Sequence, residues 1–341
     1  MTVGFGGPPR SRAITNRHLE TALKLAVRAP SLHNSQPWLW RVDDSTVQLY
    51  LDDSKRLPAT DPQCRELVIS CGAALHHLLV ALASMGRHGR VHRLPDPASP
   101  SLLARVDLSG GAGRLADAEL AEAIERRRTD RRRFTSWPVP VELIGKFRQV
   151  AAVEGLQLHS ITDPDQRWRV YQAIEAAAQT QYADPAHTAE LAAWSGKGAD
   201  SLSGVPAANV PPPEPVVGQP HLRRFERPEL LQPPSHGEPE AAALLVVSTP
   251  ADTVLQWLRA GEVTSAILLT ATRERLASSP LSQPLEVPDT REFLRERVTA
   301  NAHPQILLRV GFASPDAQLL PATPRRPLNE VIASVDGWHE I

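Results

Sequence analysis

The sequence predicts an α+β protein composed of two related halves, and three observations lead to this expectation. Amphipathic helical segments alternate with short strand-like segments along most of the chain. The length of 341 residues is enough for about two units, since ~150 residues is typical of one domain. A weak internal repeat relates a helix in the first part of the chain to a helix in the second.

The repeat relates the segment that begins at Gly72 to the segment that begins at Gly261. Matching positions keep a constant offset of 189 residues, and they are Gly72, Leu78, Leu79 and Val80 against Gly261, Ile267, Leu268 and Leu269. Such a match arises by chance between two buried helices, or from two copies of a half-domain related by a pseudo-twofold axis. The second alternative predicts a dimer fused into one chain, with a first half over residues 1–115 and a second half over 116–341.

The first half is expected to begin with a helix over residues 16–29. Leu19, Leu23 and Ala26 lie on one face of it, and Pro30 ends it. Next come two strands joined by a hairpin turn, then a long apolar helix and two further strands. Their expected ranges are 38–42 and 46–51, 65–85, and 90–94 and 103–108.

The second half contains a long insertion between its regular elements. Helices are expected at residues 117–128, 141–153, from 164 onward, 252–277 and 290–300, and strands at 156–161, 241–248 and 305–310. Residues 195–240 contain ten of the 32 prolines and show no helix or strand pattern. Such a stretch is typical of a lid, a binding loop or a linker. We expect a lid, because proline lowers the entropy cost of ordering a closed loop.

Composition argues against several classes of protein. A formal net charge of −1 disfavours a nucleic-acid-binding protein that works by bulk electrostatics. Two cysteines, Cys64 and Cys71, cannot form a disulfide framework and indicate a reducing compartment. Residues 1–13 lack the apolar core of a signal peptide, and we expect no apolar run of ~18 residues that would cross a membrane. The expected location is the cytoplasm.

A polar loop follows the first predicted helix, over Arg28-Ala-Pro-Ser-Leu-His-Asn-Ser-Gln-Pro-Trp38. Ser31, Asn34 and Gln36 place donors and acceptors between two prolines. Such a set suits the edge of a heterocycle, on which donors and acceptors alternate. The alternative is an ordinary polar turn anchored by Trp38.

Arginine is concentrated at residues 126–133. Four of the 37 basic residues are lysines, so 33 are arginines, an excess that coding bias explains. The cluster, however, holds six arginines and a single acid, Asp130, so some of them are expected to bind an anion such as phosphate. The alternative is a solvated basic face or a nucleic-acid patch. The segment Thr323-Pro-Arg-Arg-Pro327 joins this site only if it folds back onto the cluster.

These three segments together resemble the nitroreductase family of flavoproteins. The family's Pro-Ser-x-x-Asn-x-Gln-Pro-Trp loop matches residues 30–38, its Arg-Arg-Ser-x-Arg pattern resembles residues 127–131, and its terminal Pro-Arg-Arg-Pro matches residues 324–327. With the segment 277–286 included, the whole chain is similar to the Acg-type branch known from mycobacteria. The resemblance implies two nitroreductase-like halves fused as a pseudo-dimer, with one FMN between them and residues 195–240 as a lid insertion.

The resemblance also implies the residues that bind the cofactor. The FMN phosphate is expected at Arg127, Arg128, Thr129, Arg131, Arg325 and Arg326. The isoalloxazine is expected beside Ser31, Leu32, Asn34 and Gln36, with Arg28 and Pro30 in the same site. Backbone groups are expected near flavin N5 and O4 at Pro280, Leu281, Ser282 and Gln283. Neither a catalytic acid or base nor a metal is expected, because the flavin carries the hydride chemistry.

Two functions are compatible with this resemblance. The first is flavin storage, sequestration or a restricted redox role, and the second is NAD(P)H-dependent reduction of nitro compounds or quinones. Family members often have a Glu-Gly pair beside N5 where this chain has Ser282-Gln283, and the ordinary two-subunit enzymes lack the insertion. Both differences favour the first function. The expected partners are FMN, with NAD(P)H as a candidate, and not nucleic acid or membrane; the chain is a monomeric pseudo-dimer or forms a homodimer.

Overall fold

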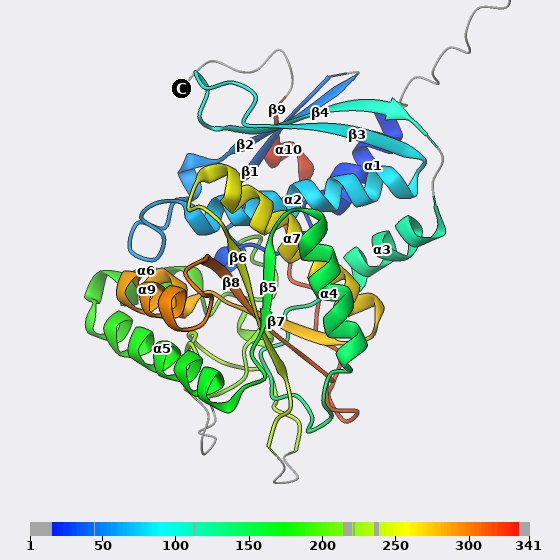
Figure 1. Ribbon diagram of the computed structural model, residues 1–341. Coiled ribbons are helices and arrows are strands. Elements are labelled where there is room, and N and C mark those ends of the chain that lie inside the picture. Colours follow the sequence, from blue (N-terminus) through cyan, green and yellow to red (C-terminus); the bar gives the residue numbers. More distant parts are fainter. Residues whose placement is uncertain are drawn as a thin grey trace, which may run out of the picture.

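The computed structural model describes residues 16–43, 45–111, 114–213, 220, 222–234 and 239–333. Within these ranges the chain forms two sheets, and two long helices, α2 (Arg65–Ser84) and α7 (Val254–Arg273), pack together between them (Figure 1). The expected α+β class is confirmed. Residues 1–13, where we expect no signal peptide, lie outside the described residues.

The first sheet has the strand order β3-β4-β2-β1-β9. Its strands are β1 (Trp38–Val42), β2 (Thr46–Leu51), β3 (Arg87–Arg93), β4 (Leu102–Gly110) and β9 (Ile332–Ala333). Neighbouring strands are antiparallel except β9, which runs parallel to β1. Trp38, Trp40 and Leu49 are fully buried in the core that this sheet forms with α1 (Asn16–Ala26) and α2. Each large apolar side chain buried in this way contributes about 1.5–3 kcal/mol.

The second sheet has the order β5-β6-β8-β7 and is antiparallel throughout. Its strands are β5 (Gln157–Ser160), β6 (Ala243–Thr249), β7 (Ala277–Leu281) and β8 (His303–Gly311). Alternate residues of β6 pack on opposite faces of the sheet. Leu245 and Val247 contact the layer of α4 (Val141–Val153) and α7. Leu244 and Val246 contact the layer of α5 (Pro164–Ala183) and α9 (Pro288–Arg297). The connections contain α3 (Leu115–Arg126), α6 (Pro185–Trp194), α8 (Gln283–Glu286) and α10 (Leu328–Val331).

The two sheets share one topology. Read from the first strand of each, the orders are β1-β2-β4-β3 and β5-β6-β8-β7. In each sheet a long helix, α2 or α7, connects the second strand to the third, and another helix, α1 or α4, precedes the first strand. The expected division at residue 115 falls at the start of α3, while β9 near the C-terminus completes the first sheet.

The central helices cross with their backbones in contact at two glycines. A Cβ placed on Gly72 would lie 2.0 Å from the carbonyl oxygen of Leu258, and one placed on Gly261 would lie 1.9 Å from that of Ile69. Only glycine fits at either position. One turn further on, His76 Nδ1 and Ser265 Oγ are hydrogen-bonded at 2.9 Å, and these residues are again 189 apart.

The element ranges agree with the sequence expectations in most places. Strands Trp38–Val42 and Thr46–Leu51 and helix Val141–Val153 have the expected bounds. The sequence does not predict β7. The helix expected over 252–277 ends earlier, at Arg273, and the left-handed backbone of Arg275 (φ 61°) then turns the chain into this strand. The polar sequence of β7, with Pro280 inside it, is tolerated because this strand lies at the edge of the sheet.

Helix α2 corrects one further expectation. By length and composition it is apolar enough to cross a membrane, so the expectation that no run meets this criterion is wrong. Most of the helix is buried inside the fold, between the first sheet and α7. A helix covered on all sides is apolar all round, and this burial accounts for its sequence.

We expect Gly72→Ala and Gly261→Ala each to lower the free energy of unfolding by about 3 kcal/mol or more, because the new methyl group meets backbone atoms that cannot move aside. Gly145→Ala, in α4 with no atom near its Cβ position, is the control and is expected to gain about 0.5–1 kcal/mol. Urea denaturation of the three variants measures this, and equal stabilities would contradict the close crossing.

Candidate functional site

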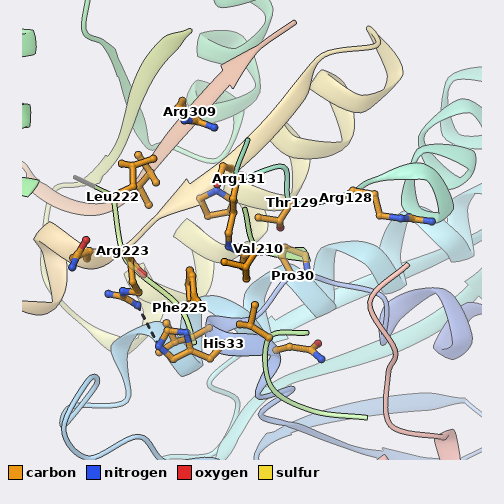
Figure 2. Close-up of a pocket in the computed structure, with 18 of the residues that line it drawn as sticks. Pro30, His33, Arg128, Thr129, Arg131, Val210, Leu222, Arg223, Phe225 and Arg309 are labelled. Carbon is orange, nitrogen blue, oxygen red and sulfur yellow. Dashed lines mark hydrogen bonds between the residues drawn. The ribbon is translucent and has the colours of Figure 1, made fainter. Parts of the chain in front are cut away.

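A cavity of about 270 Å³ is lined by residues of α2 and α7 and of the loops near them (Figure 2). Its walls come from the loop after α1, one face of α2, the loop after α3, the end of β7 with the turn that follows, and part of the segment 195–240. Ala322, Thr323 and Arg325 also line the cavity, and the charges of Arg127, Arg28 and Arg128 act on Arg325, so the C-terminal motif does fold back towards the arginine cluster. Of the sequence-predicted residues, those that line the cavity are Arg28, Pro30, Ser31, Leu32, Asn34, Arg127, Arg128, Thr129, Arg131, Pro280, Leu281, Ser282, Gln283 and Arg325.

One end of the cavity is strongly cationic. Among the described residues, Arg28, Arg127, Arg128 and Arg325 form no ion pair with a carboxylate. Burial, followed by the repulsion of Arg128, Arg28 and Arg131, lowers the pKa of Arg127 to about 10. The Nε groups of Arg127 and Arg128 are buried without a hydrogen-bond partner. A cluster of this kind is stabilised by an anion that accepts from these guanidinium groups.

Arg325 makes contacts that the sequence did not predict. All its N–H groups are directed to backbone carbonyls: Nε to Val27, Nη1 to Thr323 and Pro324, and Nη2 to Arg28 and Ala29. It therefore caps the end of α1 and holds the start of the polar loop. Burial and then the charges of Arg127, Arg28 and Arg128 lower its pKa to about 9, so it adds positive potential to the cluster.

Arg326 and Gln36 do not line the cavity. Arg326 Nη1 donates to Asp52 Oδ2 at 3.2 Å, and its Nη2 donates to the Glu330 carbonyl. Gln36 is fully buried, and its Nε2 donates to the Leu202 carbonyl at 2.6 Å while its Oε1 accepts from the Arg326 backbone N–H. Both residues therefore connect the polar loop to the segments that pack over it.

The polar loop is held in an unusual backbone conformation. His33, Asn34 and Gln36 have φ values of 47°, 56° and 53°, the left-handed region that non-glycine residues seldom adopt. The Leu32 N–H donates to Ser70 Oγ at 3.1 Å, and Asn34 Nδ2 donates to the carbonyls of Gly204 and Pro324. Asn34 Oδ1 is buried without a partner. The loop thus presents fixed polar groups to the cavity.

The edge strand β7 presents backbone groups to the same cavity. The Ser278 carbonyl accepts from the Asp130 N–H at 2.9 Å, on the edge away from β8. Because backbone groups alternate along a strand, the Pro280 carbonyl points to that same free edge. Proline has no N–H that could be left unpaired at this edge. The edge therefore offers the Pro280 carbonyl as an acceptor, and the turn at Ser282 follows it.

Part of the segment 195–240 also lines the cavity. The sequence patterns did not reveal the contacts that this part makes. Arg223 forms an ion pair with the buried Glu286, and its Nη1 donates to His33 Nε2 at 3.2 Å (Figure 2). Phe225 lies beside them, with the Arg131 guanidinium 4.9 Å from its ring centre and the His33 ring edge-on at 5.9 Å. Burial, then Arg223, lowers the pKa of His33 to about 3, so the imidazole stays neutral and accepts this hydrogen bond.

Comparison with known proteins identifies the family. The chain is 43% identical over 341 residues to "Putative NAD(P)H nitroreductase Rv3131" of Mycobacterium tuberculosis, covering 97% of each chain. It is 34% identical over 330 residues to "Putative NAD(P)H nitroreductase acg" of the same organism, covering 93% of this chain and 96% of that protein. The chain therefore belongs to the family of these nitroreductase-like proteins, the Acg-type branch. No family model matches the sequence.

Solved structures show more distant likeness. A nitroreductase with bound FMN from Bacteroides fragilis aligns with 65% of this chain and 98% of its own at 15% identity, with a TM-score of 0.37. The NADPH:FMN oxidoreductase of Vibrio harveyi, complexed with NAD+, covers 65% and 79% at 14% identity, with a TM-score of 0.39.

We expect Arg325→Lys to lower the free energy of unfolding by about 2 kcal/mol, although it keeps the charge, because an ammonium group cannot reach all five carbonyls. Arg126→Lys, exposed on the last turn of α3, is the control and is expected to have no effect. Thermal unfolding followed by circular dichroism measures both, and an unchanged Arg325→Lys protein would show that the capping contacts contribute nothing.

Proposed function

We propose that the chain binds one FMN in the cavity and keeps it for storage, sequestration or a restricted redox role. One observation carries this proposal: at one end of the cavity lies a group of arginines without carboxylate partners. The polar loop and the edge of β7 line other parts of the same cavity. These residues fit the cofactor. A dianionic phosphate is the ligand that relieves the repulsion among Arg127, Arg128 and Arg28, and Thr129 adds a hydroxyl beside them.

The remainder of the cavity suits the flavin ring. Ser31, Leu32 and Asn34 offer donors, acceptors and an apolar surface from one side, and the Pro280–Gln283 edge offers backbone groups from the other. When bound, FMN supplies the two-electron redox chemistry, so the protein needs only to bind it, orient it and control access to it. We expect the fixed left-handed loop to perform the orientation, because its geometry does not depend on the ligand.

The two halves are best explained as a fused pseudo-dimer. Their common topology, the crossing of Gly72 with Gly261 and the His76–Ser265 hydrogen bond agree with a pseudo-twofold axis between α2 and α7, since equivalent residues meet at such an axis. The offset of 189 residues also shows which residue of α7 corresponds to a cavity residue of α2, and this comparison is why we propose one FMN and not two. Ala73 lines the cavity, whereas position 262 holds Glu262, which pairs with Arg93 in the equivalent place.

We propose that residues 195–240 act as a lid. The ion pair of Arg223 with Glu286 holds the described part of this segment, around residues 222–225, against the cavity, and Phe225 covers part of the cavity wall. Both favour storage over turnover. The names of the relatives support the alternative, an NAD(P)H-dependent oxidoreductase acting on nitro compounds or quinones. Cys64 and Cys71 are free and buried, which agrees with the cytoplasm as the place of action.

Removal of an arginine that we propose to bind the phosphate tests the site. Arg127→Ala and Arg128→Ala are each expected to weaken FMN binding about tenfold or more, since a hydrogen bond to a charged group contributes about 1.5–3 kcal/mol. Arg126→Ala removes the same charge one position away, outside the cavity, and is expected to bind FMN normally. Titration of apoprotein by flavin fluorescence gives the three affinities. Unchanged affinity in both cavity variants would reject the site.

Anaerobic mixing with NADPH separates the two functions. We expect the absorption band of oxidised flavin to persist in the wild-type holoprotein, and iodide to quench its flavin fluorescence weakly. Arg223→Met, which removes the ion pair that holds the lid, is expected to increase both reduction and quenching. Rapid bleaching of the wild-type flavin would favour the oxidoreductase, and equal quenching in the two proteins would reject the lid.

A further inference from the structure

Glu66 carries a buried carboxyl group on the wall of the cavity. Its ion-pair partner is Arg65, which does not belong to the arginine cluster. It lies in the first turn of α2, is 4% exposed and lines the cavity. Its Oε1 accepts from Arg65 Nη2, and the same nitrogen donates to the Leu285 carbonyl at 3.2 Å. Since Leu285 follows the turn at Ser282 and Gln283, Glu66 is attached to the β7 end of the cavity.

A second connection runs from Glu66 to the polar loop. The Ser70 hydroxyl donates to the Glu66 carbonyl at 2.7 Å and accepts from the Leu32 N–H at 3.1 Å. The backbone of Glu66 is thus linked through Ser70 to the polar loop, and its carboxylate is linked through Arg65 to the segment after β7, the two segments that we propose to flank the flavin ring. Glu240, the other acid on the cavity wall, has different partners, because it accepts from the Phe134 N–H and pairs with Arg309 of β8.

Charges of both signs surround Glu66. Arg65 from the same helix, Arg223 from the segment 195–240 and Arg291 from α9 favour the ionised carboxylate, whereas Asp61 before α2 and Glu286 from α8 oppose it. Burial is the largest effect, and it raises the pKa of Glu66 to about 7. A modest change of charge in the cavity is therefore enough to change the protonation of this group near neutral pH.

We propose that Glu66 takes up a proton when the bound flavin is reduced and returns it when the flavin is reoxidised. The inference rests on the proposed FMN site. A hydride donor would give the flavin two electrons and one proton, whereas at an electrode the two electrons would come from the electrode and the proton from solvent. Either way the ring would gain one negative charge. That charge favours the neutral carboxylic acid, so the Glu66 carboxylate gains a proton from solvent. On reoxidation an acceptor receives two electrons and one proton from the flavin and the second proton from Glu66, so charge and atoms balance.

The test is the pH dependence of the flavin midpoint potential in the holoprotein, measured by spectroelectrochemistry. Each proton taken up with two electrons lowers the potential by about 30 mV per pH unit. Above neutral pH we therefore expect the wild-type slope to be steeper than that of Glu66→Gln by about 30 mV per pH unit. Glu262→Gln is the matched control. Glu262 is also buried, is also paired with an arginine and has a pKa raised to about 7 by burial, but it does not line the cavity.

Three outcomes are distinguishable. Equal slopes in wild type and Glu66→Gln, with flavin bound to both, would overturn the role of Glu66 and leave the FMN site intact. Failure of the wild-type protein to bind flavin would reject the proposed function itself. If Glu66→Gln does not fold, redox-difference infrared spectra of the wild-type protein decide. We expect the carbonyl band of a protonated carboxylic acid to appear on reduction, and its absence would contradict the proposal.

Discussion

The close crossing of α2 and α7 sets how near the two sheets approach each other. At Gly72 and Gly261 the two helix backbones are in contact, and no side chain can be introduced between them. This contact fixes the distance between the two sheets, and with it the width of the cavity whose walls come from both halves. The polar loop is hydrogen-bonded to α2 through Ser70, and the edge strand β7 follows α7, so the packing of these two helices brings both segments to the same cavity.

The second controlling feature is electrostatic. Burial of arginines without counter-ions is unfavourable, since each cation loses hydration and repels its neighbours. The lowered pKa values of Arg127 and Arg325 express this cost. The fold holds the cluster in place through backbone contacts of Arg325 and through the packing of α1, so the positive potential exists before a ligand arrives. An anion that binds there recovers free energy that the folded protein has already spent, a property of preorganised sites.

The sequence predicted most of the regular elements and the residues around the cavity, and the failures have physical causes. Strong periodicity located Trp38–Val42, Thr46–Leu51 and Val141–Val153 without error. Edge strand β7 could not be found, because a strand that pairs on one side only needs no apolar alternation. The capping role of Arg325 depends on carbonyls almost 300 residues away in sequence. Arg223 and Glu66 gain their importance only from burial and from partners on other elements, which local patterns do not reveal.

In the proposed site the arginine cluster selects the phosphate of FMN, and a comparison of FMN with riboflavin, which has the same ring and no phosphate, tests this selection. Calorimetric titration of the apoprotein with each ligand gives both affinities and the stoichiometry. We expect one FMN per chain, bound about 100-fold or more tightly than riboflavin, since two charge-assisted contacts of about 1.5–3 kcal/mol are lost without the phosphate. Equal affinity for the two flavins would reject the phosphate site.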